Sequence, residues 1–144
     1  NHCPYVKHIA DMLAEVTNDF IGRGVAIFAI NSNDVRAYPD DSPAAMKDEI
    51  ELRGYRFAYL VDDDQSAAHA YRAACTPDFF LFDGDRRLVY RGQLDGSRPG
   101  NGVAVTGADL GAAVDALLAG TPVPADQRPS IGCSIKWREA RRRG

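Results

Sequence analysis

Asn1-His2-Cys3-Pro4-Tyr5-Val6-Lys7-His8 opens the sequence and says more about the fold than any other stretch. Pro4 directly follows Cys3, and proline is favoured at the first position of an α-helix. Apolar residues then recur at steps of three and four, which predicts an amphipathic helix from about Pro4 to Ile21. Cys3 should therefore lie at the positive end of the helix dipole with His2 beside it. Both features favour the thiolate, which is the reactive form of cysteine.

The alternative is a buried, unreactive cysteine that happens to precede a proline, since free cysteines often behave as small hydrophobic residues. The wider motif favours the reactive cysteine. His-Cys-Pro-Tyr-Val-Lys-His at residues 2–8 resembles the start of the first long helix in a peroxiredoxin-like (AhpC/TSA-type) branch of the thioredoxin superfamily. In that branch the motif is Cys-Asn-His-Cys-Pro-Tyr-Val. The resemblance therefore implies that a cysteine and a central strand precede Asn1, so that the sequence begins inside the domain.

Composition indicates one ordinary globular domain. The chain has 144 residues, of which 45% are hydrophobic and 26% charged. A net charge of -3 gives no reason to expect nucleic acid, and no apolar run approaches the ~18 residues of a membrane span. The three cysteines are too few and too widely spaced for a disulfide-stapled secreted scaffold. No signal peptide is visible, so we expect a cytoplasmic protein, with export left open because upstream residues are expected.

Strands and helices should alternate along the rest of the chain. Apolar runs at Val25–Ile30 and Phe57–Val61 predict strands, and the first should be buried on both faces, as in a parallel sheet. Phe79–Phe82 and Leu88–Arg91, joined by an Asp-Gly-Asp turn, predict a β-hairpin. Further helices are expected over residues 44–53, 65–71 and from 106 to about 118, the last with a buried stripe formed by Leu110, Val114, Leu117 and Leu118.

With a strand supplied upstream, this order gives an α/β, thioredoxin-like fold, in which a central mixed sheet is flanked by helices. Val25–Ile30 and Phe79–Phe82 should then flank a gap left by that strand. We expect a thioredoxin-like domain at 1–121 and a tail at 122–144 that can pack over it. The acidic run at 62–64 does not match an EF-hand and is better explained as an acidic helix entry, so no metal site is predicted.

Thr76-Pro77 directly precedes an apolar strand, and the resemblance implies that it is the cis-proline loop of thioredoxin-like folds. There, the loop lies beside the active-site cysteine and offers backbone groups to a substrate. Cys75 should accordingly lie near Cys3. It could also be a small residue that merely fills the base of the loop.

Two further residues are candidates for the site. The glycine-rich segment 93–105 carries Arg98, a cation that could reach an anionic or peroxide-bearing site, although a solvent-exposed loop arginine is the simpler interpretation. The tail contains Ser130-Ile131-Gly132-Cys133, an apolar patch with the third thiol. The tail could fold back so that Cys133 acts as a resolving cysteine, or it could pack as a lid with an unreactive thiol.

The resemblance implies a thiol-dependent oxidoreductase, either a peroxidase or a thiol–disulfide reductase. Cys3, Cys75 and Cys133 are the candidate catalytic residues, and the cysteine expected before Asn1 is the alternative to Cys3 as nucleophile. His2, Pro4, Thr76, Pro77 and Arg98 are the candidate substrate-binding residues. Expected partners are a peroxide or protein disulfide, a thiol reductant such as a thioredoxin, and a second copy of the chain as one candidate. No cofactor, nucleic acid or membrane is expected. The alternative is a non-catalytic metal-handling or binding module that uses His2, Cys3 and His8.

Overall fold

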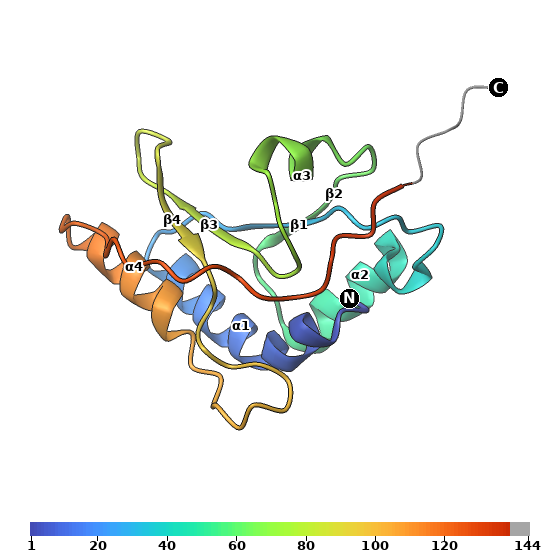
Figure 1. Cartoon of the computed structure of the whole chain (residues 1–144), viewed down its shortest axis with the longest axis horizontal. Coiled ribbons are helices and arrows are strands. Elements are labelled where there is room, and N and C mark those ends of the chain that lie inside the picture. Colours follow the sequence, from blue (N-terminus) through green and yellow to red (C-terminus); the bar gives the residue numbers. More distant parts are fainter. Residues whose placement is uncertain (139–144) are drawn as a thin grey trace.

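The computed structural model describes residues 1–138, so the last residues of the expected tail, including the arginines at 141–143, lie outside the described part. The elements follow the predicted order of helices and strands (Figure 1). They are α1 (Pro4–Gly22), β1 (Phe28–Asn31), the 3₁₀ turn η1 (Pro39–Asp41), α2 (Pro43–Arg53), β2 (Ala58–Val61), α3 (Ser66–Tyr71), β3 (Phe79–Phe82), β4 (Leu88–Gly92) and α4 (Ala108–Leu118).

Helix α1 confirms the prediction made from the opening stretch. Cys3 is its N-cap residue and Pro4 its first helical residue. One face of the helix is buried and packs with α4 and the β3–β4 hairpin around the main core. That core is formed by Ile9, Phe20, Leu81, Tyr90, Leu94, Leu110, Ala113 and Val114. The opening motif is thus held at one end of a packed 19-residue helix, and none of the described helices is long and apolar enough to cross a membrane.

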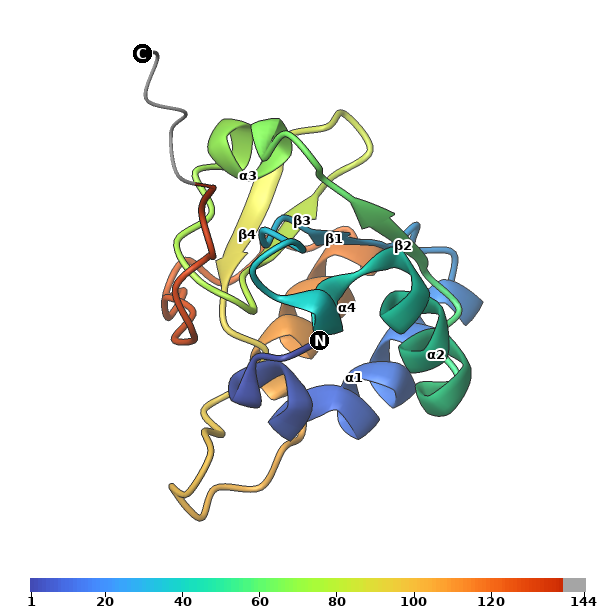
Figure 2. The same cartoon turned by 90° about the vertical axis from the view of Figure 1, so that its right-hand side faces the viewer.

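The strands form two separate pairs. β1 is parallel to β2, with Phe28 opposite Ala58, whereas β3 and β4 form the predicted antiparallel hairpin. Within the described residues β1 is not hydrogen-bonded to β3, as the predicted gap between these two segments requires. Figures 1 and 2 show α1, α2 and α4 on one side of the strands and α3 on the other.

Three predicted details were wrong. The first strand begins at Phe28 rather than Val25, because the Val25 N–H donates to the Phe20 carbonyl at the end of α1, at 3.0 Å. This strand is also not buried on both faces, since the Phe28 side chain is 65% exposed and β1 has a partner strand on one side only. Leu118 is likewise exposed rather than part of the buried stripe, because it is the last residue of α4.

The starts of α2 and α3 agree with the helix-capping residues predicted from the sequence. The Ser42 hydroxyl accepts a hydrogen bond from the Ala45 N–H at the start of α2. The buried Asp62 carboxylate accepts from the Ala67 and Ala68 N–H groups at 3.0 and 2.9 Å, so it binds the free amides at the start of α3. The acidic run therefore contributes a helix cap, as predicted.

The tail crosses the molecule as a hydrogen-bonded segment, residues 127–138, that we call the strap (Figure 1). It begins against β4, where the Gln93 N–H donates to the Arg128 carbonyl at 3.0 Å. At its far end the Lys136 N–H donates to the Asn33 side chain at 2.9 Å, and the Arg138 N–H donates to Gln65 at 2.9 Å. The strap therefore links the hairpin to the carboxyl ends of β1 and β2.

Candidate active site

Cys3 lies buried at the start of α1, with only 1% of its surface exposed. Its carbonyl accepts the Lys7 N–H, the first bond of the helix, while its Sγ lies 3.3 Å from the Thr76 carbonyl oxygen. The Thr76–Pro77 peptide bond is cis. The motif cysteine and the Thr76-Pro77 loop, 73 residues apart, are therefore in direct contact.

The strap brings a second thiol to Cys3. Thr76 and Cys133 form an antiparallel β-bridge, in which each backbone N–H donates to the other carbonyl, at 2.8 and 3.0 Å. The Cys3 and Cys133 sulfurs lie 2.6 Å apart, and both cysteines are free. Two thiols that are 130 residues apart in the sequence are thus in contact at one point.

The surroundings of the two sulfurs shift their pKa values in opposite directions. Burial alone would raise the pKa of Cys3. Hydrogen bonds from the Cys133 thiol and the Val6 backbone N–H outweigh burial, so the pKa of Cys3 is lowered. Burial and the adjacent Cys3 sulfur raise the pKa of Cys133. Of the two thiols, Cys3 is therefore the one that loses its proton more readily.

Cys75 is placed differently from the other two cysteines. Its sulfur donates to the Pro77 carbonyl at 3.4 Å, within its own loop. Burial, and then the negative charge of Asp78, raise the pKa of Cys75 to about 11. The thiol that contacts Cys3 is Cys133 rather than Cys75, and the surroundings of Cys75 favour a protonated, weakly reactive thiol.

His2 is held away from the sulfurs by a buried carboxylate. Its Nδ1 lies 2.6 Å from Asp41, and its ring stacks on Tyr38 with ring centroids 4.5 Å apart. Its neighbour Pro4, another predicted substrate-binding residue, is exposed at the start of α1. The structure therefore gives His2 a structural contact at the helix entry, whereas Pro4 remains open to solvent beside Cys3.

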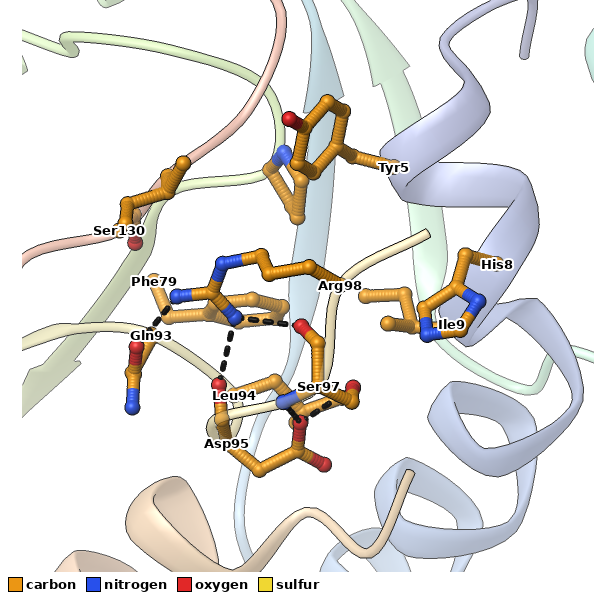
Figure 3. Close-up of a pocket in the computed structure, with 12 residues that line it drawn as sticks. Tyr5, His8, Ile9, Phe79, Gln93, Leu94, Asp95, Ser97, Arg98 and Ser130 are labelled. Atoms are coloured by element: carbon orange, nitrogen blue, oxygen red, sulfur yellow. Dashed lines mark hydrogen bonds between the residues drawn. The ribbon is translucent and has the colours of Figure 1, made fainter. Parts of the chain in front are cut away.

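Arg98 lies in a small cavity of about 20 Å³, room for about one water molecule, between α1, the loop after β4 and the strap (Figure 3). Pro77 and His8 also line this cavity. The guanidinium donates to the Asp95 carbonyl at 2.8 Å, and also to the Ser97 carbonyl and the Gln93 side chain. It is thus held by neutral oxygens of its own loop rather than lying free in solvent.

The Arg98 cavity also contains unpaired polar atoms. Arg98 Nε and His8 Nε2 are buried and have no hydrogen-bond partner among the described residues. The Thr76 hydroxyl, beside Cys3, is a further buried polar atom without a partner in the described part of the chain. Polar groups in this state are usually satisfied by water or a ligand, so both places can accept one.

Sequence reasoning missed two buried carboxylates that hold the site together. Asp41 is fully buried and binds the His2 ring and the Asn33 amide. In the sequence, each of the two carboxylates is only an acidic residue in a polar loop, and most exposed loops contain such residues.

The other missed carboxylate is Asp95, which closes the base of the loop that carries Arg98. It accepts hydrogen bonds from the backbone N–H groups of Ser97, Thr106 and Gly107 at 2.8, 2.7 and 2.7 Å. These bonds join the two ends of a glycine-rich segment whose sequence predicts no regular structure. Asp95 therefore fixes the position of Arg98 relative to Pro77.

The described residues contain no group of three or more His, Cys, Asp or Glu side chains that could hold a metal ion. In particular, the set proposed for a metal-handling module, His2, Cys3 and His8, does not converge on one point. The His2 ring binds Asp41, and His8 lines the Arg98 cavity.

Comparison with known proteins agrees with this arrangement. Residues 1–91, from the motif to the end of the hairpin, match the AhpC/TSA family. The chain belongs to the AhpC/TSA family. This confirms the family and the thioredoxin-like fold expected from the opening motif, and members of this family act through thiols as peroxidases or reductases. No curated protein matches the chain.

Two solved structures extend the likeness through the strap. A hypothetical protein from Sinorhizobium meliloti 1021 is 55% identical, with a TM-score of 0.95 over 97% of this chain and 76% of that one. An uncharacterized conserved protein from Geobacillus kaustophilus is 58% identical, with a TM-score of 0.95 over 97% of this chain and 74% of that one. The arrangement of nearly the whole AhpC/TSA chain, beyond the matched residues 1–91, is therefore shared with these two proteins.

Proposed function

We propose that this chain is a thiol–disulfide oxidoreductase in which Cys3 is the nucleophile and Cys133 the resolving thiol. The observation that carries the proposal is the 2.6 Å contact between their sulfurs. Lowering the pKa of Cys3 makes it the better thiolate at neutral pH, and raising that of Cys133 keeps the second thiol protonated until it is needed.

In the reducing direction, the Cys3 thiolate attacks one sulfur of a substrate disulfide and expels the other as a thiolate, which takes up a proton. Cys133 then loses its proton and attacks the Cys3 sulfur of the mixed disulfide, which releases the second substrate thiol. The substrate gains two electrons and two protons, and Cys3 and Cys133 become a disulfide. A dithiol reductant of the thioredoxin type would reverse this change and complete the cycle.

Disulfide exchange fits this site better than peroxide reduction because of the way Cys133 is presented. It lies in an extended segment whose backbone pairs with Thr76. A cysteine in an extended peptide of a partner protein can pair with the same backbone groups once the strap moves. A peroxide needs no such backbone edge, although Cys133 could also resolve a sulfenic acid formed on Cys3.

The test is to treat the fully reduced protein with one equivalent of glutathione disulfide or of hydrogen peroxide, and then to map disulfides by mass spectrometry. We expect a Cys3–Cys133 disulfide, formed faster with glutathione disulfide. Cys133→Ser should stop at a Cys3–glutathione mixed disulfide, and Cys3→Ser should form neither product rapidly.

Three outcomes would contradict the proposal. A much faster reaction with hydrogen peroxide would show a peroxidase instead. A Cys3–Cys75 disulfide would show that Cys75, and not Cys133, is the resolving thiol. A Cys3 that reacts no faster than Cys75 would favour a non-catalytic module, and binding of Zn²⁺ or Cu⁺ by titration would then be the next measurement.

A further inference from the structure

Gly132, the residue before Cys133, lies against the Thr76 backbone with no room for a side chain. A Cβ built on Gly132 would overlap the Thr76 carbonyl oxygen, and it would lie 2.6 Å from the Thr76 carbonyl carbon and 3.2 Å from the Pro77 nitrogen. All three of these atoms belong to the main chain and cannot rotate out of the way. Any residue larger than glycine at position 132 must therefore shift the strap or the Thr76–Pro77 loop.

A second glycine, which belongs to the domain rather than to the strap, also allows a close approach of the two backbones. Gly92 ends β4, and a Cβ built there would lie 2.5 Å from the Arg128 carbonyl oxygen of the strap. The same carbonyl accepts the Gln93 N–H. At these two points the strap packs backbone to backbone on the domain, with one glycine supplied by the domain and one by the strap.

The close approach at Gly132 controls where the Cys133 sulfur lies. Residue 132 directly precedes the bridge residue, so a displaced backbone at 132 opens the two bonds between Thr76 and Cys133. Those two bonds hold the Cys133 backbone in place, and so they determine the distance between the Cys3 and Cys133 sulfurs. A displacement of about 1 Å at a reacting group can lower a rate by about 100-fold.

We propose that Gly132 is a positioning residue for the redox pair, because only a residue without a side chain lets Cys133 pair with Thr76 and reach Cys3. This inference rests on the proposed function and adds a sequence requirement to it. The resolving thiol must follow a glycine, and the same holds for any partner cysteine that binds this backbone edge in place of the strap.

The experiment measures closure of the disulfide. Reduced protein is mixed with glutathione disulfide: Cys3 takes one glutathione as a mixed disulfide and releases the other, and Cys133 then expels the first. Overall, two protein thiols are oxidised and one glutathione disulfide is reduced to two glutathiones. In Gly132→Ala, we expect the second step to slow by about 10- to 100-fold and the mixed disulfide to accumulate, while the first step persists.

Two further readouts separate positioning from a general loss of structure. The equilibrium constant of the Cys3–Cys133 pair with glutathione should fall by a similar factor in Gly132→Ala. The midpoint of Cys3 alkylation against pH should move upward from its wild-type value, because the Cys133 thiol no longer donates to Cys3. A purely structural role for Gly132 would lower the melting temperature without moving either quantity.

Gly111→Ala is the matched control, since a Cβ at Gly111 in α4 meets nothing within 4 Å. It should close its disulfide at the wild-type rate. Gly92→Ala is the second variant: it displaces the strap near residue 128, farther from Cys133, so a smaller slowing is expected. It keeps the idea testable if Gly132→Ala does not fold.

Wild-type closure rates in both Gly132→Ala and Gly92→Ala would overturn the inference, as would a wild-type rate in Gly92→Ala alone if Gly132→Ala does not fold. A wild-type protein that never forms the Cys3–Cys133 disulfide would instead contradict the proposed function. The two failures are therefore distinguishable.

Discussion

Cys75 and Cys133 are two candidate partners for Cys3, and they differ in how the chain presents them. Cys75 is the immediate neighbour of Thr76, while Cys133 belongs to a segment far along the sequence. The Cys75 sulfur donates to the Pro77 carbonyl of its own loop, at 3.4 Å. Cys133 pairs with Thr76 across an antiparallel bridge, and its sulfur lies 2.6 Å from that of Cys3. Pairing across the bridge, rather than nearness in sequence, brings a second thiol into contact with Cys3.

The difference between these thiols is sharpest in their reaction with an alkylating reagent. A thiol at the ordinary pKa of 9.0 is about 1% thiolate at pH 7, whereas one of pKa about 11, as for Cys75, is about 0.01% thiolate. The greater intrinsic nucleophilicity of the more basic thiolate reduces this roughly 100-fold ratio to roughly 10-fold. Because the pKa of Cys3 is lowered, Cys3 should react with iodoacetamide at pH 7 at least roughly 10-fold faster than Cys75.

Two single-cysteine variants make this measurement, one that keeps Cys3 and one that keeps Cys75, with serine at the other two positions. Serine at 133 keeps a hydroxyl donor near Cys3. The Cys3 rate should level off at a lower pH than that of an ordinary thiol, and the Cys75 rate should still be rising at pH 10. Equal rates at pH 7 would remove the basis for treating the two thiols differently.

Gln65 tests the far end of the strap. This buried side chain donates to the Ser32 and Lys136 carbonyls at 2.7 and 3.0 Å and accepts the Arg138 N–H at 2.9 Å. Gln65→Ala leaves buried backbone groups unpaired, so the free energy of unfolding should fall by about 1–3 kcal/mol. The Cys3–Cys133 disulfide should form more slowly, by roughly fivefold, which is about 1 kcal/mol of misplacement.

Urea unfolding of the reduced protein measures the first effect, and glutathione-driven closure measures the second. Lys47→Ala, on the exposed surface of α2, is a control without strap contacts. If Gln65→Ala lost stability but closed its disulfide at the wild-type rate, the bridge at Thr76 would position Cys133 without help from the far end.

Features of the fold and the site that depend on residues close together in the sequence could be predicted, whereas features that depend on distant residues could not. The start of α1, with Cys3 as N-cap and Pro4 after it, followed from the local preference of proline for the first helical turn. The α2 cap at Ser42 was equally local. The family motif supplied the rest of the fold and the position of Thr76-Pro77 beside Cys3.

Long-range and neighbour-dependent features could not be predicted in this way. The sequence allowed Cys133 to be either a resolving thiol or an inert one, because its position depends on backbone bonds to a loop 57 residues earlier. The exposure of Phe28 depends on which strands lie beside β1 rather than on its own apolar run. Asp41 became informative only when its partners at the start of the chain were known.

Arg98 should have a modest effect that depends on the charge of the substrate. Its guanidinium is held by its own loop near Pro77, so it should attract anionic substrates without contacting the sulfurs. A partly screened charge is worth about 0.3–1 kcal/mol. Arg98→Gln should therefore slow the reaction of Cys3 with glutathione disulfide, which carries carboxylates, by about two- to fivefold. The rate with neutral hydroxyethyl disulfide should not change.

Salt provides the check on Arg98, because 0.5 M NaCl should reduce the difference between wild type and Arg98→Gln. An equal loss with both disulfides would mean that the arginine orders the loop rather than attracting a charge.

The smallest effect is expected from removing Cys75 itself. In Cys75→Ser, the hydroxyl can donate to the Pro77 carbonyl as the thiol does, so the free energy of unfolding should change by less than about 1 kcal/mol. Closure of the Cys3–Cys133 disulfide should stay within about twofold of wild type, because Cys75 does not contact the reacting sulfurs and its loss leaves the Thr76 bridge intact. Urea unfolding and glutathione-driven closure measure both quantities, with Cys133→Ser as the variant that must fail to close. If Cys75→Ser closed more than tenfold slower at unchanged stability, Cys75 would take part in the exchange. Pairing with Thr76 across the bridge would then not decide which of the two thiols serves Cys3.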